Sequence, residues 1–333
     1  MTIRPKLKLP CILALITLFA VNLAGCAEKN ASRVLQSGKN APEGTTVLAV
    51  YEAWFGEGDH IDVGYSCHDK VVLSKQVEQA QNMGITGFVV DWYGTSKPFI
   101  DGSFASLQQV AADKNFKVAL MYDEIEDDAS HMTENAISHL DYAYQNYIGP
   151  NAPSHGAYLT YEGRPMIFVW PRGGKTDWAR VREHLNSWAQ PPLLIYKDEP
   201  SKYSDLFDGR YAWIHAGKAG FKPDGSDWGE DYLQNFYSKM TSQNTNKIIV
   251  GAAWAGFDDS RASWSENRYM DHRCGKTLEE TLHYPRRYFS SSNPLPFLLI
   301  ATWNDHEEGT AIERGIAKVP PSKHSQSLNC NGD

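Results

Sequence analysis

The segment Pro296-Phe297-Leu298-Leu299-Ile300-Ala301-Thr302 is a short apolar run that begins at a proline and ends at a polar turn. A run of this kind predicts a strand that is buried on both faces. Runs of similar composition recur along the chain, and together they make eight: residues 47–55, 87–92, 117–122, 165–169, 192–196, 211–215, 247–253 and 296–303.

Helix-like segments separate most of these runs. Residues 73–83 carry apolar residues at helical spacing and end at Gly84, a natural C-cap. Further candidates are residues 104–112, 129–147, 177–189, 228–240 and 278–289, whereas the segment around 201–207 is short. Eight alternations of strand and helix predict an α/β protein with a single-domain (β/α)8 TIM barrel. The eighth helix is expected to be short or missing, because a polar tail with Pro320 and Pro321 follows Arg314.

The N-terminus has the features of a lipoprotein signal peptide. Three basic residues precede an apolar run over residues 11–24, which is shorter than the ~20 residues that span a bilayer. Small residues stand directly before Cys26, which predicts cleavage after Gly25 and lipidation, including palmitate, at Cys26. Ala27 favours the outer membrane of a diderm bacterium as the destination. An ordinary secretory signal, and therefore a secreted protein, is the alternative.

The expected organisation is a signal peptide over residues 1–25, a flexible tether over 26–45, the barrel over 46–315 and a polar C-terminal tail over 316–333. The formal charge of −8 becomes about −11 after cleavage, because residues 1–25 hold three cations and no carboxylate. This charge argues against nucleic acid or an anionic polymer as the ligand.

Five cysteines occur, of which Cys11 leaves with the signal and Cys26 would carry lipid. An exported protein permits a disulfide among Cys67, Cys274 and Cys330, and the odd number leaves one thiol free. The sequence leaves the pairing open, and we favour Cys67–Cys274 because Cys330 lies in the polar tail. The chain has no CxxC or HExxH pattern and its histidines are scattered, so no metal site and no cofactor are expected.

Aromatic and acidic residues recur where the predicted strands end. In a barrel of this kind the C-terminal strand ends meet at one face and form the active site. Aromatic rings offer flat apolar faces to sugars, and carboxylates accept hydrogen bonds from hydroxyl groups. Any single one of these residues could instead be a core tryptophan, a helix cap or a buried histidine. Their repetition predicts a carbohydrate groove, with substrate-binding residues Trp54, Asp91, Trp92, Glu124, His215, Asp258, Trp303 and Asn304.

The eighth run leads directly into Trp303-Asn304-Asp305-His306-Glu307-Glu308-Gly309-Thr310. Asp305 and Glu308 are three residues apart, so on one turn their Cβ atoms lie about 5–6 Å apart. Two carboxyl groups at this range can divide into an acid and a base, as glycosidic bond cleavage requires. An Asp-x-x-Glu pair is also a helix capping box, but a loop rather than an apolar helix follows.

This motif resembles the strand-eight end of glycoside hydrolase families 71 and 99 and their bacterial relatives. Supporting matches surround strand two at Gly84–Gly94, strand four at Gly163–Phe168 and strand seven at Gly256–Ser260, so the resemblance spans about residues 47–314. It implies a barrel enzyme that acts on α-linked glycans, such as α-mannan or α-1,3-glucan, without a cofactor.

By position in the motif, the resemblance implies that Glu308 is the general acid and Asp305 is the second carboxylate. Aspartate at this second position follows the family 71 pattern, whereas family 99 has glutamate there. His306 and Glu307 depart from both families, and Glu307 is a third carboxylate that could take the acid's place. The expected partner is an oligosaccharide or polysaccharide. The alternative is a non-catalytic, glycan-binding lipoprotein on a hydrolase barrel that has lost its activity.

Overall fold

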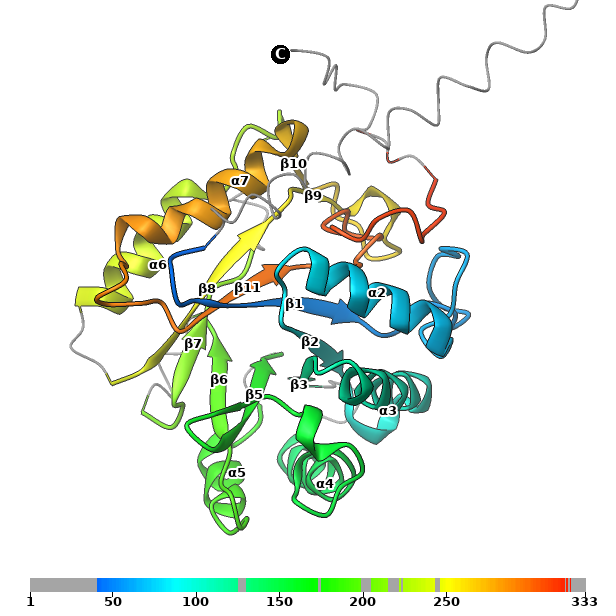
Figure 1. Ribbon diagram of the computed structural model, residues 1–333, viewed down its shortest axis with the longest axis vertical. Coiled ribbons are helices and arrows are strands. Elements are labelled where there is room, and N and C mark those ends of the chain that lie inside the picture. Colours follow the sequence, from blue (N-terminus) through cyan, green and yellow to red (C-terminus); the bar gives the residue numbers. More distant parts are fainter. Residues whose placement is uncertain are drawn as a thin grey trace, which may run out of the picture.

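The computed structural model describes residues 41–124, 130–172, 175–198, 205–214, 222, 224–242, 246–320, 322 and 324. Within these residues the chain forms a closed barrel of eight parallel strands surrounded by helices, which confirms the predicted fold (Figure 1). The strand order around the barrel is β3-β2-β1-β11-β8-β7-β6-β5, in which the first strand of the chain, β1, pairs with the last, β11. The barrel closes because β3 also pairs with β5. The barrel strands are β1 (Thr46–Glu52), β2 (Gly87–Trp92), β3 (Lys117–Asp123), β5 (Arg164–Trp170), β6 (Leu193–Lys197), β7 (Gly209–Tyr211), β8 (Ile248–Trp254) and β11 (Phe297–Ala301).

β1 and β7 differ most from their predicted bounds. β1 ends at Glu52, and the next residues form turns, so the strand is shorter than the apolar run. β7 covers Gly209–Tyr211 rather than residues 211–215. A Cβ on Gly209 would lie 2.5 Å from the backbone oxygen of Ile248, so a glycine allows the close approach of β8. A glycine and an arginine carry no apolar strand signal, which explains why the sequence misplaced this strand.

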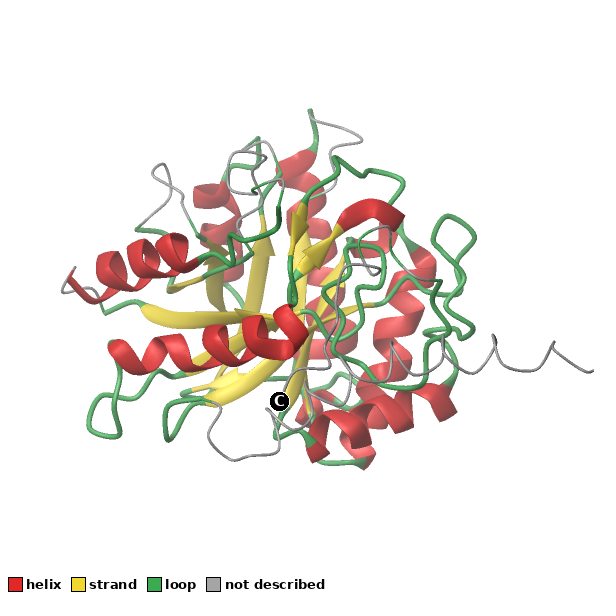
Figure 2. Cartoon of the chain, turned by 90° about the horizontal axis from the view of Figure 1, so that it is seen from above, coloured by secondary structure: helices red, strands yellow, loops and turns green. Residues whose placement is uncertain are grey.

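Helices form the outer layer, which Figure 2 shows around the strands. α2 begins after Asp69, whose side chain accepts a hydrogen bond of 2.8 Å from the amide of Val71. No helix follows β11 within residues 302–320, as the sequence predicted. The helices are α2 (Lys70–Asn82), α3 (Pro98–Asp113), α4 (Met132–Ala143) with a π-helical turn (Tyr144–Ile148), α5 (Trp178–Leu185), α6 (Glu230–Ser242) and α7 (Lys276–His283) with a 3-10 turn (Tyr284–Arg287).

Two short antiparallel strand pairs lie outside the parallel barrel. β4 (Thr160–Tyr161) pairs with the start of β5, and β9 (Phe257–Asp258) pairs with β10 (Tyr269–Met270). The second pair shapes the segment that follows β8, close to the end of β11, because the amide of Asp258 donates to the carbonyl of Glu308 at 2.7 Å. This contact places the β8 and β11 ends side by side.

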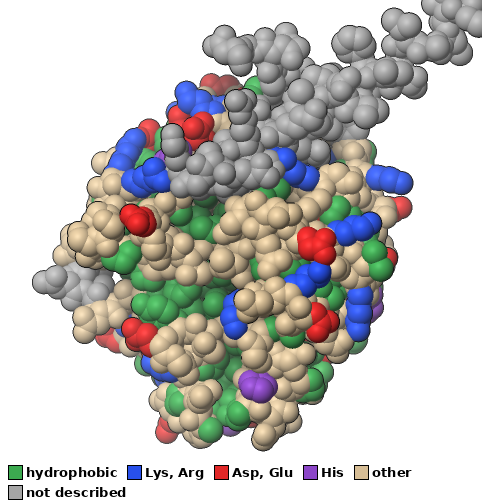
Figure 3. Space-filling view, in the orientation of Figure 1, with side chains coloured by type: hydrophobic (Ala, Val, Ile, Leu, Met, Phe, Trp, Pro, Cys, Tyr) green, Lys and Arg blue, Asp and Glu red, His purple; other side chains and the backbone are tan. Residues whose placement is uncertain are grey.

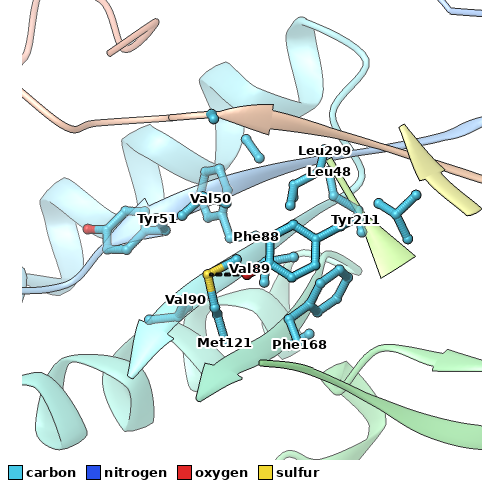
Figure 4. Packing of buried hydrophobic residues seen from close by; sticks show 14 of the residues in the cluster. Leu48, Val50, Tyr51, Phe88, Val89, Val90, Met121, Phe168, Tyr211 and Leu299 are labelled. Carbon is cyan, nitrogen blue, oxygen red and sulfur yellow. Dashed lines mark hydrogen bonds between the residues drawn. The ribbon is translucent and has the colours of Figure 1, made fainter. Parts of the chain in front are cut away.

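Large apolar side chains fill the interior of the barrel (Figure 4). The hydroxyl of Tyr211 donates a hydrogen bond of 3.0 Å to the carbonyl of Val169 and lies 3.8 Å from the sulfur of Met121. Tyr211 therefore satisfies its polar atom while its ring packs near Phe168. The interior is a packed core rather than a pore, so ligands can be received only at its ends.

The favoured disulfide pairing is wrong. Cys67 is a buried free thiol whose sulfur lies 3.4 Å from the hydroxyl of Tyr51, whereas Cys274 is disulfide-bonded. Cys67 is packed between β1 and α2, and this position cannot be read from cysteine spacing. Cys26 and Cys330 lie outside the described residues. Among the described residues, no helix combines the length and the apolar character needed to cross a membrane.

Candidate active site

Two acids at neighbouring strand ends project into the barrel. Tyr51 on β1 donates a hydrogen bond of 2.9 Å to Gln76 of α2, so Tyr51 points outward to the helices. Side chains alternate along a strand, and Glu52 therefore points to the interior. On β2 the indole of Trp92 donates to an aspartate of α3, so Asp91 likewise points inward. Glu52 and Asp91 are partners in the parallel register of β1 and β2.

Further charged groups stand at the ends of β3 and β6. Arg172 donates two hydrogen bonds to the carboxylate of Asp123, the last residue of β3. The ammonium of Lys197, the last residue of β6, lies 3.2 Å from the ring centroid of Trp170 on β5. Burial lowers the pKa of Lys197 to about 7, although the charges of Asp123 and Glu308 oppose this shift. The end of the barrel therefore combines acids with two cations and an aromatic ring.

Glu308 presents a partly exposed carboxyl group in the segment that follows β11. Its side chain is 22% exposed, and Oε1 accepts a hydrogen bond of 3.1 Å from the indole of Trp264. Arg268 lies 3.6 Å from the same oxygen. Burial raises the pKa of Glu308, whereas Trp264 and Arg268 lower it and Asp259 raises it further. No described residue donates a hydrogen bond to Oε2.

Asp305 is almost completely buried, with 3% of its surface exposed. Its Oδ1 accepts hydrogen bonds from the amides of Glu307 at 2.9 Å and Glu308 at 2.8 Å, as a helix cap would. A turn rather than a helix follows Asp305. Its backbone amide donates a hydrogen bond to Thr302 Oγ1 and not to the side chain of Glu308, so no capping box forms. Burial and the charge of Glu308 raise the pKa of Asp305. Its Oδ2 has no hydrogen bond with any described residue.

The two residues that depart from the resembled families hold neighbouring segments in place. Glu307 accepts hydrogen bonds from the ring of His60 at 2.8 Å and from the amide of Ile61 at 3.2 Å, and it is 2% exposed. The ring of His306 lies 3.0 Å from a carboxylate oxygen of Glu313. Both carboxylate oxygens of Glu307 are therefore bound to the segment between β1 and α2. Of the two glutamates, Glu308 is the one with an oxygen that no described residue binds.

Two other predicted binding residues have side chains that are engaged elsewhere. Asn304 accepts from the amide of Glu52 at 2.8 Å and donates to its carbonyl at 2.9 Å, so it continues the pairing of β1 beyond the strand. Glu124 accepts hydrogen bonds of 2.7 Å from the amide of Arg172 and from the indole of Trp178 on α5. Glu124 thus faces the helical layer, whereas Asp123, which the sequence analysis passed over, takes the interior position.

The tryptophans divide between core and surface. Trp92 and Trp303 have no exposed surface, which corrects their assignment as sugar platforms, since neither ring presents a face to a ligand. Trp54 is 6% exposed and stacks on His60 with ring centroids 4.7 Å apart. Trp264, which the sequence analysis passed over, is 41% exposed and meets Trp54 edge-on at 6.4 Å. Trp264 is the aromatic residue in contact with Glu308.

Asp258 belongs to a turn. It accepts a hydrogen bond of 3.1 Å from the amide of Ser260 and lies 3.2 Å from the ring of His324. Burial would raise the pKa of Asp258, but hydrogen bonds from Ser322 and Ser260 outweigh it and the pKa is lowered. This is the turn role that the sequence allowed as an alternative. His215 lies outside the described residues.

The structure thus brings Asp91, Asp305 and Glu308 toward the same end of the barrel, where their charges influence one another. The charge of Glu308 contributes to the raised pKa of both Asp91 and Asp305. Six residues that the sequence did not single out complete this group: Glu52, Asp123, Arg172, Lys197, Trp264 and Arg268. The first four are charged residues at, or within two positions of, the end of a barrel strand, which is their sequence signal. Trp264 and Arg268 lie in the long segment between β8 and α7, where no end of a barrel strand marks them. On the face drawn in Figure 3, acidic and basic side chains of the described residues are interspersed.

Comparison with known proteins gives a structural likeness only. No family model matches the chain, and no curated protein matches it. Two structures of the GH99 endo-alpha-mannosidase from Bacteroides thetaiotaomicron are similar, each with a TM-score of 0.60, at 18% and 17% identity. They cover 80% and 83% of this chain and 86% and 89% of their own.

A protein described as glycoside hydrolase-like is also similar, with a TM-score of 0.58 and 14% identity over 84% of this chain and 88% of its own. The chain therefore shares the barrel of family 99 glycoside hydrolases and of a hydrolase-like protein. At such identities the likeness extends to the fold and not to the activity.

Proposed function

We propose that this protein is a glycoside hydrolase that cleaves α-linked glycans of the α-mannan or α-1,3-glucan type. The observation that carries the proposal is the environment of Glu308. Glu308 is 22% exposed at the barrel end, its pKa is raised by burial, and its Oε2 accepts no hydrogen bond from any described residue. A general acid must hold its proton until the bond breaks and must reach the leaving oxygen; the raised pKa supports the first requirement and the open Oε2 the second.

Glu308 acts in this proposal as the general acid. Trp264 and Arg268 hold Oε1, which fixes the direction of the carboxyl group and leaves Oε2 to carry the proton. Both neighbours also stabilise the carboxylate that forms when the proton has left. Trp264 adds an exposed ring beside the acid, where a sugar face can stack.

Asp305 acts as the base, either on water or on the 2-hydroxyl of the sugar. Two backbone amides hold its Oδ1, so the direction of Oδ2 is fixed without loss of its capacity to accept a proton. Burial is the main cause that raises the pKa of Asp305, and the charge that Glu308 acquires when it gives up its proton adds to it. A raised pKa makes the ionised Asp305 a stronger base. Two carboxyl groups in different surroundings can thus serve as acid and base, Glu308 as the acid and Asp305 as the base.

The substrate class rests on the sequence motif and on the structural relatives. The similar proteins from Bacteroides thetaiotaomicron are named endo-alpha-mannosidases, which makes α-mannan the first substrate to test. A reducing-sugar assay on α-mannan and α-1,3-glucan, with mass analysis of the products, tests the proposal. Release of sugar that is lost in Glu308→Gln supports it, and no release from either polysaccharide contradicts it.

A glycan-binding protein without catalysis is the second candidate, and the burial of Asp305 favours it. A base with 3% of its surface exposed must be reached by substrate through the barrel end. Binding of oligosaccharide without hydrolysis in the same assay would establish this alternative.

We further propose that the protein is exported and anchored through a lipid on Cys26. The support is the sequence alone: the basic start, the apolar run over residues 11–24 and the small residues before Cys26. An anchored hydrolase would act on glycans at the cell surface, and its short tether over residues 27–45 would leave the barrel free of the membrane.

A further inference from the structure

Two carboxyl groups at the barrel end have oxygens that no described residue satisfies. Glu52 is 4% exposed and its Oε2 has no hydrogen-bond partner; Asp91 is 8% exposed and its Oδ1 has none. The other oxygen of Asp91 accepts a hydrogen bond of 2.8 Å from the hydroxyl of Tyr93. Buried polar atoms are nearly always paired in folded proteins, so two orphaned oxygens on neighbouring strands call for an explanation.

The nearby cations do not supply the missing partners. Arg172 is bound to both carboxylate oxygens of Asp123, and the ammonium of Lys197 lies over the ring of Trp170. Among the described residues, neither cation forms an ion pair with Glu52 or Asp91. The two oxygens are therefore unsatisfied despite positive charge close by.

Their position connects them with the proposed catalytic pair. Glu52 and Asp91 are register partners that point into the barrel, as their outward-facing neighbours Tyr51 and Trp92 require. Burial is the main reason that the pKa of Glu52 lies well above its ordinary value, and the charges of Asp91, Asp305 and Glu308 follow in that order. The two groups thus face the same interior end as Asp305 and Glu308.

We propose that Glu52 Oε2 and Asp91 Oδ1 bind two adjacent hydroxyl groups of the sugar ring on which Asp305 and Glu308 act. Glu52 is then a substrate-contacting residue in addition to those that the sequence suggested. The inference rests on the proposed function, because it places the sugar at the same barrel end.

Proton sharing explains why a diol fits this pair. Two buried carboxyl groups side by side ionise together only at a high free-energy cost, so in this proposal the pair shares one proton. The protonated partner donates a hydrogen bond to one hydroxyl, and the ionised partner accepts one from the other hydroxyl. Burial raises the pKa of both groups; the charge of Asp91 raises that of Glu52 further, and the charge of Asp123 adds to the rise at Asp91. We assign the shared proton to Glu52, because Tyr93 and Arg172 stabilise charge on Asp91. A cationic ligand would instead require both groups to ionise.

The test compares Glu52→Met with Glu52→Gln in a Glu308→Gln background, which keeps the ligand intact. The readouts are Tm without ligand and the Kd for oligosaccharides derived from α-mannan and α-1,3-glucan. Met removes an unsatisfied buried group, so Tm should rise, while the Kd should weaken by ~10-fold because two hydrogen bonds to the ligand are lost or misaligned. Gln can still donate and accept, so its Kd should stay within ~3-fold of the parent. The exposed Glu78→Met is the matched control, with an unchanged Kd.

The pH dependence gives a second readout that needs only Glu52→Gln. In the parent, affinity should fall as rising pH removes the shared proton, because the donor to the hydroxyl is lost. Gln cannot ionise, so this loss should shrink. A Kd in Glu52→Met equal to that of the parent overturns the inference, and so does an absence of binding to both oligosaccharide sets.

Failure of the proposed function is read separately, in hydrolysis by the unaltered protein. Hydrolysis together with unchanged binding in Glu52→Met rejects only the diol subsite. Binding that depends on Glu52, without any hydrolysis, rejects only the catalytic proposal.

Discussion

Glu307 and Glu308 are adjacent in sequence and differ in what surrounds them. Glu307 is held by His60 and by the amide of Ile61, whereas Glu308 keeps one oxygen open. The proposal that Glu308 is the acid therefore rests on hydrogen bonding and not on residue type. The proposal that Asp305 is the base rests on the same kind of evidence, because two backbone amides hold its Oδ1 and no described residue binds its Oδ2.

Glu308→Gln should reduce the hydrolysis of unactivated glycans by ~10²–10⁴-fold, since general acid catalysis is lost. Aryl glycosides with good leaving groups need little protonation, so their kcat should fall much less. Asp305→Asn should impair both substrate classes, because its part is at the sugar. Measured kcat/KM for both classes checks this. A leaving-group-dependent loss in Glu307→Gln but not in Glu308→Gln would show that the acid has been assigned one residue too far along.

Trp264→Phe should shift the pH profile of hydrolysis. The indole donates a hydrogen bond to Glu308 Oε1 and so lowers the pKa of Glu308 against the effect of burial. Phenylalanine cannot donate, so the pKa of Glu308 should rise and the loss of activity at high pH should begin at a higher pH. Profiles of kcat/KM against pH for both proteins provide the measurement. A basic limb that stays in place would mean that Glu308 is not the titrating acid.

At the scale of elements, the segment between β1 and α2 is tied to the segment after β11 by buried acids. Glu313 accepts hydrogen bonds from Tyr65 at 2.9 Å and from Gln76 at 2.6 Å, and it lies 3.0 Å from the ring of His306. Gln76 on α2 also accepts a hydrogen bond from the hydroxyl of Tyr51. This network joins the segment after β11 to α2, in the absence of an eighth helix within residues 302–320.

Glu313→Gln should lower the free energy of unfolding by ~1–3 kcal/mol, because an amide nitrogen would face a buried donor and leave it unpaired. Urea unfolding monitored by circular dichroism gives the value. The control is Glu78→Gln on α2, an exposed carboxylate paired with Lys114, which should leave the midpoint unchanged. Equal midpoints for Glu313→Gln and the control would show that the network adds nothing to stability.

At the scale of the whole molecule, buried acids of raised pKa set the pH dependence of stability. Glu52, Asp91 and Asp305 bind protons more tightly in the folded than in the unfolded state. Their contribution is complete below their unfolded pKa of about 4 and is lost as pH rises through their folded pKa. Asp258 and Asp259 have lowered pKa values, and their contribution is lost as pH falls below about 4.

Tm should therefore be highest in mildly acidic buffer and should fall as the pH rises further above the unfolded pKa of these acids, about 4. Thermal unfolding at constant ionic strength measures the trend. Glu52→Gln should flatten it, because one of the titrating groups is removed. A Tm that rises steadily to pH 8 would contradict the raised pKa values of the barrel end.

The proposed lipid anchor is also tested at the scale of the whole chain. Expressed in a diderm bacterium, the protein should be recovered in the outer-membrane fraction, and Cys26→Ser should not be processed to the lipidated form. Fractionation after a salt wash, with mass analysis of the N-terminus, measures both. Equal membrane retention of Cys26→Ser would favour an anchor other than the predicted lipid.

The sequence by itself determined the barrel fold, because strand–helix alternation can be recognised from local sequence patterns without knowledge of tertiary contacts. The run over Gly87–Trp92 coincides with β2, and the missing eighth helix follows from Pro320 and the polar tail. It also placed Asp305 and Glu308 after the last strand, where the barrel geometry brings the strand ends together.

Only the tertiary structure decided which residue at each strand end faces inward. Strands of a parallel barrel are buried on both faces, so they lack the polar–apolar alternation that reveals orientation in an exposed sheet. One position changes the face, which is why Trp92 and Glu124 belong to the helical layer while Asp91 and Asp123 point inward. Glu52 became a candidate for the same reason: its unsatisfied oxygen is a property of its surroundings, which no local pattern records.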